Sequence, residues 1–105
     1  MDDYLPDIYR SVRDRYPGVV TALGTVARAA EEAGPLDERT RRLVKLAASI
    51  GAQAQGAVRS NARKALDAGA TPEEIRQVAM LAVTTCGFPA VVAAMGWMDD
   101  VAGAG

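Results

Sequence analysis

Apolar residues recur along this chain at spacings of three and four, the spacing that places side chains on one face of an α-helix. No run of β-branched residues alternates with polar residues at a period of two, so no strand is expected. Breaks rich in Gly and Pro divide the pattern into about six segments. The pattern therefore predicts an all-α fold, a helical bundle of about six helices in a single domain over residues 1–105.

The first three predicted helices are bounded by Pro, Gly or a capping residue. One begins near Pro6 and stops before the Tyr16-Pro17-Gly18 break, because Pro disfavours helix in the residue before it. A second runs from Val19 to about Ala33, and Asp37 is the expected N-cap of a third. The expected inner faces are Leu5, Ile8, Tyr9, Val12 and Tyr16, then Val20, Leu23, Val26 and Ala27, then Leu43, Val44, Leu46, Ala47 and Ile50.

The second half of the chain predicts three further helices. Gly51 to Gly56 is the expected elbow, and a helix follows from about Ala57 to Ala68 and stops at Gly69. Thr71-Pro72-Glu73-Glu74 is the strongest start signal, with an N-cap, a first-turn Pro and acids that favour a helix N-terminus. The next helix is expected to bury Ile75, Val78, Ala79, Leu81 and Ala82.

The last helix, from Pro89 to about Val101 after a Cys86-Gly87-Phe88-Pro89 break, is apolar nearly all round. Such a helix needs cover on more than one side, so it is the candidate subunit interface of an oligomer. The alternative is a helix in the centre of the core. Its apolar residues are Val91, Val92, Ala93, Ala94, Met95, Trp97 and Met98.

Composition and charge exclude several classes of function. The net charge is −1 with both signs interspersed, so no nucleic-acid partner is expected, because phosphate binding needs clustered Lys and Arg. No apolar run is long enough to span a bilayer, and the N-terminus MDDYLPDIYR lacks the apolar core of a secretory signal. One Cys and no His predict a cytoplasmic protein without an internal disulfide, and no cofactor or metal is predicted.

Three segments in combination resemble the carboxymuconolactone decarboxylase and alkylhydroperoxidase D (AhpD) family. They are LDERTRRLVKLAASIGA, ALDAGATPEEIRQVAMLA and TTCGFPAVVAAMGWMDD, between about residues 36 and 101. The resemblance implies an AhpD-like helical fold that assembles into dimers, trimers or hexamers. It also implies a Cys-x-x-Cys-x-x-x-His motif at the elbow, with a Glu upstream, that reduces peroxides or partner disulfides.

The reactive residues of that motif are missing here. At the family's spacings the two cysteines fall on Ala54 and Ala57, the His on Asn61 and the Glu on Arg42. Alanine has no thiol, Asn cannot exchange a proton near neutral pH, and Arg inverts the charge of the Glu. Dithiol redox chemistry is therefore not expected.

Cys86 is the only thiol in the chain. Its functional interpretation is a peroxidatic or regulatory cysteine close to a helix break. The alternative is a small buried apolar residue, and the absence of a neighbouring Lys or Arg favours this alternative because a thiolate needs an electropositive setting.

Polar side chains around the elbow are the candidate ligand site. With Arg42 or Arg59 holding a carboxylate, they would line a pocket for a small acid or lactone; otherwise they form a solvated helix start. The candidate ligand-binding residues are Arg42, Gln53, Gln55, Arg59 and Asn61, with Ser60 and Arg63 beside them.

Three functions stay open at this point. The first is binding, or a non-redox reaction, of a small acid or lactone at the polar elbow of a homo-oligomer. The second is antioxidant peroxidase activity through Cys86. The third is a structural role in an assembly with an active paralogue. Whether the protein is an enzyme is left open.

Overall fold

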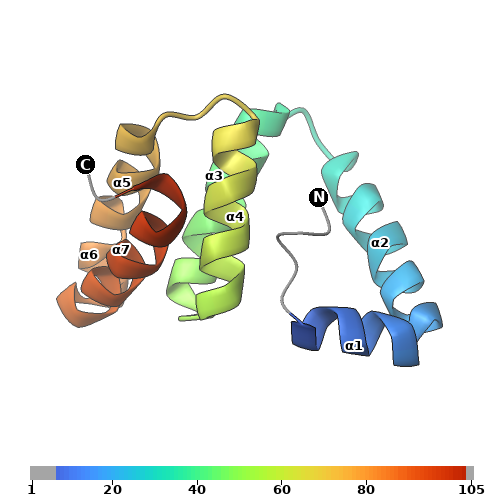
Figure 1. The fold of residues 1–105 in the computed structure, drawn as a ribbon. Helices are drawn as coiled ribbons and strands as arrows, with labels where there is room; N and C mark the ends of the chain where they lie inside the picture. The colour runs from blue at the N-terminus through green and yellow to red at the C-terminus, as the bar shows by residue number, and fades with distance from the viewer. Residues whose placement is uncertain (1–6, 104–105) are drawn as a thin grey trace. The chain divides into compact units, whose positions relative to one another are not determined.

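A computed structural model describes residues 7–103 of the chain (Figure 1). These residues form helices and connecting turns without a strand, so the all-α prediction is confirmed. The chain divides into two compact units, Met1–Pro35 and Leu36–Gly105, and each is described by itself. The predicted helix start near Pro6 and the predicted inner-face residue Leu5 lie outside the described residues.

The first unit contains α1 (Asp7–Arg15) and α2 (Pro17–Glu31). Tyr16 separates the two helices, and Pro17 starts the second one, because proline has no N–H that a first turn would leave unsatisfied. Helix α2 begins two residues before the predicted start at Val19, and it also ends two residues before the predicted end near Ala33.

The prediction that one face of each of these two helices is buried is wrong. No described residue of the first unit is buried, and Ile8 and Leu23 are 71% and 61% exposed. The physical reason is that two short helices offer too little surface to cover each other's apolar stripes. The other large residues of these faces are also exposed, namely Tyr9, Val12, Tyr16 and Val26.

The second unit contains α3 (Glu38–Gly51), α4 (Gln55–Asp67), α5 (Pro72–Leu81), the single turn α6 (Val83–Cys86) and α7 (Phe88–Ala102). The start of α4 at Gln55 shortens the predicted elbow to three residues, Ala52–Ala54. The predicted last helix and its preceding break are confirmed, since Gly87 has a φ of 92° that L-residues other than Gly rarely adopt.

Capping residues fix the ends of these helices as predicted. The Asp37 carboxylate accepts a hydrogen bond of 2.8 Å from Thr40 N, and hydrogen bonding from Thr40 lowers the pKa of that carboxyl. Thr71 and Glu74 form a reciprocal capping box at the start of α5. Gly69, at φ 101°, follows the end of α4.

The core lies entirely in the second unit and is built by α3, α4, α5 and α7. Several of its residues are Ala, which allows the helices to approach closely. Helix α7 buries one stripe, so it is a core helix on that face; its other face, including the 53%-exposed Val92, leaves the predicted subunit interface untested. The buried apolar residues are Leu46, Ile50, Val58, Ala62, Ala65, Ala70, Ile75, Ala79, Val91, Ala94 and Met98.

Three residues predicted to be buried in the second unit are exposed. Val44 and Leu81 are 53% and 68% exposed, and Ala47 is also exposed. Their helices carry apolar stripes wider than the core covers, so the edge of each stripe remains on the surface.

Within residues 7–103, no helix combines the length and the apolar character needed to cross a bilayer.

Candidate functional site

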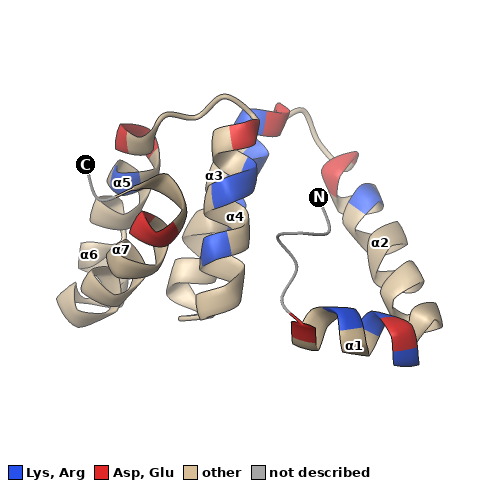
Figure 2. Ribbon diagram, in the orientation of Figure 1, with Lys and Arg blue, Asp and Glu red and all other residues tan. Residues whose placement is uncertain are grey.

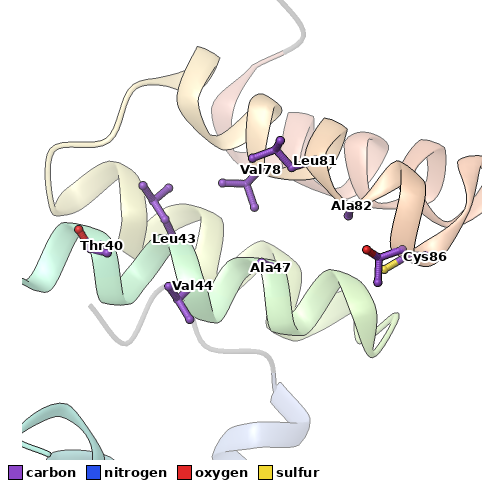
Figure 3. A pocket seen from close by; sticks show the side chains of 9 residues that line it. Thr40, Leu43, Val44, Ala47, Val78, Leu81, Ala82 and Cys86 are labelled. Atoms are coloured by element: carbon purple, nitrogen blue, oxygen red, sulfur yellow. The ribbon is translucent and has the colours of Figure 1, made fainter. Parts of the chain in front are cut away.

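A groove of about 400 Å³ lies between α3 and the α5–α6 segment of the second unit (Figure 3). This volume is within the roughly 300–1,000 Å³ that small-molecule sites occupy. The lining contains no Lys, Arg, Asp or Glu, and its polar groups are two hydroxyls and one thiol. The lining residues are Thr40, Leu43, Val44, Ala47, Val78, Leu81, Ala82, Thr85 and Cys86.

The groove follows from the width of the apolar stripes on its two walls. On α3, Thr40, Leu43, Val44 and Ala47 recur at helical spacing beside the residues that enter the core. The α5 wall is built in the same way by residues next to the buried Ile75. Figure 3 shows Leu43 of α3 and Val78 of α5 pointing toward one another, whereas Val44 points to the other side of α3 in this view.

An ion pair joins the two walls at one end. Arg39, the neighbour of Thr40 in α3, pairs with Glu74 in the first turn of α5. Both side chains are partly exposed, so the pair orients the two helix starts rather than contributing a buried charge to the groove.

The thiol marks the opposite end. Cys86 is half-buried, and its Sγ lies 3.9 Å from the position that a Cβ on Gly51 would occupy. The absence of a side chain at Gly51 therefore keeps the space beside the sulfur open. Of the site residues predicted from the sequence, Cys86 is the one that lines the groove.

The positions of the family's reactive motif lie together on α4. Ala54 is the N-cap of this helix, and Ala57 and Asn61 follow at spacings of three and four, which places all three on one face. The Asn61 amide donates a hydrogen bond of 3.3 Å to the backbone carbonyl of Lys45 in α3. Arg42 is half-buried on α3. This face carries no thiol, imidazole or carboxylate at the motif positions.

The polar side chains of the elbow connect helices. Gln53 donates to the carbonyl of Ile50 at 2.9 Å and to that of Ala90 in α7 at 3.2 Å. Arg59 donates to one carboxylate oxygen of Asp100 through Nε and Nη2, at 3.0 and 2.7 Å. These contacts fix the elbow and α4 to α7.

Gln55 extends this network. With its amide oxygen turned toward Arg59, it accepts hydrogen bonds of 2.8 and 3.0 Å from the guanidinium. Of the predicted ligand-binding residues Arg42, Gln53, Gln55, Arg59 and Asn61, none lines the groove. The predicted polar pocket at the elbow stays a prediction.

The sequence analysis assigned the aliphatic residues of the groove to the core. The signal that would have identified them is the breadth of the apolar stripe on α3, which continues from the buried Leu46 and Ile50 to the exposed Val44 and Ala47. Thr40 and Thr85 gave no signal, because isolated threonines are common near helix ends.

Among residues 7–103, no cluster of three or more His, Cys, Asp or Glu side chains is placed to hold a metal ion.

Comparison with known proteins gives one informative result. The family model described as the carboxymuconolactone decarboxylase family matches residues 17–100, which is most of the chain. No curated protein matches the sequence.

Proposed function

Because this chain belongs to the carboxymuconolactone decarboxylase family, we propose that it is a non-redox member that binds a small neutral molecule, of the lactone class, in the groove between α3 and α5–α6. The observation that carries the proposal is a groove that is large enough for a small molecule and is lined only by uncharged residues.

The chemistry of the lining favours a lactone over a free acid. A lactone presents ring methylenes to apolar walls and one carbonyl to a hydrogen-bond donor, and Thr40, Thr85 and Cys86 supply donors. A carboxylate placed in the same groove would lose its water without gaining a cation, which is costly. Of the two ligand classes predicted from the sequence, a small acid or a lactone, we therefore propose the uncharged lactone.

The non-redox part of the proposal rests on the motif positions. Ala54 and Ala57 cannot form a disulfide, and a chain with one cysteine has no second thiol elsewhere to replace them. Asn61 contributes a hydrogen bond to the α3 backbone in the place of a proton relay. The elbow is proposed to be a structural joint in this protein.

A thermal-shift screen of small lactones against their ring-opened hydroxy acids and small dicarboxylates tests the proposal. At ten times its Kd, a ligand adds about 1.4 kcal/mol and raises Tm by roughly 5–10 °C in a domain of this size. We expect stabilisation by at least one lactone and by none of the acids.

A pair of matched variants locates the ligand. Ala47→Phe places a ring in the groove, whereas Ala48→Phe makes the same change at an exposed neighbour outside the lining. The lactone shift should disappear in the first variant and persist in the second. An equal lactone-induced rise in Tm in both variants, or no rise in Tm with any lactone, would contradict the proposal.

Acids alone stabilising the protein would instead favour the elbow. There a carboxylate would have to compete with Asp100 for Arg59. Loss of that acid-induced shift in Arg59→Ala, with retention in Ala47→Phe, would identify the polar elbow as the site.

Peroxidase activity at Cys86 is the second candidate function, favoured by the position of the thiol on the groove wall. A hydroperoxide would convert the thiol to a sulfenic acid and release an alcohol, and an external thiol would have to restore Cys86 because the chain has no other cysteine. Reactive cysteines commonly have a cation beside them, and no Lys or Arg lines the groove. We expect wild type and Cys86→Ser to consume hydroperoxide at the same background rate with added thiol; a faster wild-type rate would establish the activity.

A further inference from the structure

The first unit presents apolar stripes that nothing within it covers. Val19, Leu23 and Val26 are 57%, 61% and 63% exposed, and their spacing of four and three places them on one face of α2. Isolated helices of this length are only marginally stable in water. The α2 face therefore needs a covering surface.

The second unit presents an apolar surface of matching kind. The groove is open on one side, because its rim residues Val44 and Leu81, one on each wall, are largely exposed. Along α3, the distance from Thr40 to Gly51 is about 16 Å at 1.5 Å per residue, the same as from Val19 to Ala30 along α2.

Each of the two surfaces is uncharged at one end and charged at the other. Residues 46–58 and 77–98 contain no Lys, Arg, Asp or Glu, so the end of the second unit that carries the elbow and α6 is uncharged (Figure 2). Asp37, Glu38 and Arg41 lie at the opposite end, at the start of α3.

Helix α2 has the same polarity along its length. Residues 16–27 contain no charged side chain, whereas Arg28 and Glu31 lie in its last turn. If α2 lies antiparallel to α3, its uncharged part meets the uncharged end of the groove and its charged turn meets the charged end.

We propose that α2 of a second copy of this chain lies along the open side of the groove, antiparallel to α3, with Val19 toward Cys86 and Val26 toward Thr40. The exchange is reciprocal, so each copy covers the other's groove. It encloses the ligand site from a direction that the groove's own walls leave open. The docking stands on the apolar surfaces alone, whether or not a lactone binds.

The amount of apolar surface fits a dimer. Five large apolar side chains, three on the α2 face and two on the groove rim, are 53–68% exposed. Stable interfaces bury roughly 800 Å² per partner, and a reciprocal exchange covers this set of side chains twice. The five are Val19, Leu23, Val26, Val44 and Leu81.

Two variants of the full chain test the docking; they carry the same new carboxylate on opposite faces of α2. Leu23→Asp places a carboxylate on the apolar face, and Thr21→Asp places one on the opposite face of the same helix. Mass is measured by light scattering over a range of protein concentration, without ligand. Far-UV circular dichroism checks that each variant remains helical.

We expect the wild type and Thr21→Asp to be dimers or larger. Leu23→Asp should dissociate at least about 100-fold more readily, because an unpaired carboxylate would be buried in an apolar groove. A wild type that is monomeric at every concentration, or two aspartate variants that behave alike, would overturn the proposal.

Disulfide trapping then identifies the occupant. Cys86 is the sole native thiol, so one engineered cysteine on α2 has one native partner residue, and wild type reports any Cys86–Cys86 background. Mild oxidation of Val19→Cys should give a covalent dimer on a non-reducing gel, and Thr21→Cys should give only the wild-type background. Loss of both thiols in Val19→Cys at monomer mass would show a chain covering its own groove. That result, or a yield of covalent dimer no greater than the wild-type background, contradicts docking of a second copy. Neither outcome depends on whether a lactone binds in the groove.

Discussion

The capping box at the start of α5 allows one small change to be followed quantitatively. The Thr71 hydroxyl accepts a hydrogen bond of 3.1 Å from Glu74 N, and a Glu74 carboxylate oxygen accepts one of 2.8 Å from Thr71 N. The second carboxylate oxygen of Glu74 pairs with Arg39 of α3. One side chain thus both starts α5 and joins the two walls of the groove.

The contributions can be separated by substitution. Thr71→Ala removes the cap and should lower the free energy of unfolding by about 1 kcal/mol. Glu74→Gln keeps an oxygen that can cap but removes the charge. It should cost roughly 0.2–1 kcal/mol, since both side chains of the pair are nearly 40% exposed, and the cost should shrink in high salt. Glu73→Gln, in the same turn but outside the box, should change stability by less than about 0.5 kcal/mol.

Urea unfolding at neutral pH, followed by circular dichroism at low and high salt, measures all three variants. A Glu74→Gln cost that high salt leaves unchanged would refute the reasoning, because that cost is assigned to the partly exposed ion pair with Arg39. Glu73→Gln, which touches neither the cap nor this pair, is the control. A Thr71→Ala variant as stable as wild type would refute the capping contribution.

Other expectations concern the caps, the core and two glycines. The lowered pKa of Asp37 means that its cap stabilises the protein above the ordinary Asp value of about 3.9 and is lost as pH falls through the folded value, so Asp37→Asn should flatten the acid side of a stability–pH curve. Ile75→Ala, in the fully buried core, should cost about 2–5 kcal/mol by chemical unfolding, whereas the half-exposed Met80→Ala should cost much less. Gly87→Ala, at φ 92°, should lower Tm, while Gly96→Ala, in the middle of α7 with nothing near its Cβ position, should raise stability by roughly 0.5–1 kcal/mol. Reversal of either paired result would contradict the structural reasons given.

The parts of the fold that depend on near neighbours could be predicted from the sequence. The Asp37 cap, the Thr71 capping box and the Gly69 stop each involve residues within a few positions of one another. Their stereochemistry is local, so residue type and order are sufficient to predict them.

What covers each apolar stripe could not be predicted. The spacing places Ile8, Leu23, Val44 and Leu81 each on the apolar face of its own helix, yet all four are largely exposed. Periodicity identifies a face that favours burial, but the covering surface depends on which elements pack together, and on whether a second chain takes part.

The role of the elbow also depended on packing. Arg59 and Asp100 are 41 residues apart, and Gln53 reaches a carbonyl 37 residues away. The sequence identified these side chains as a polar cluster with a ligand as its expected partner. The three-dimensional arrangement supplies partners from α7, so we propose the apolar groove rather than the elbow as the ligand site.

A titration of the ¹⁵N-labelled protein with the best-stabilising lactone, followed by amide chemical shifts, distinguishes binding in the groove from binding at the elbow. The groove site predicts that the largest shift changes occur between Thr40 and Ala47 and between Val78 and Cys86, with little change from Gln53 to Asn61. Changes concentrated at the elbow, or a spectrum that no lactone alters, would contradict it.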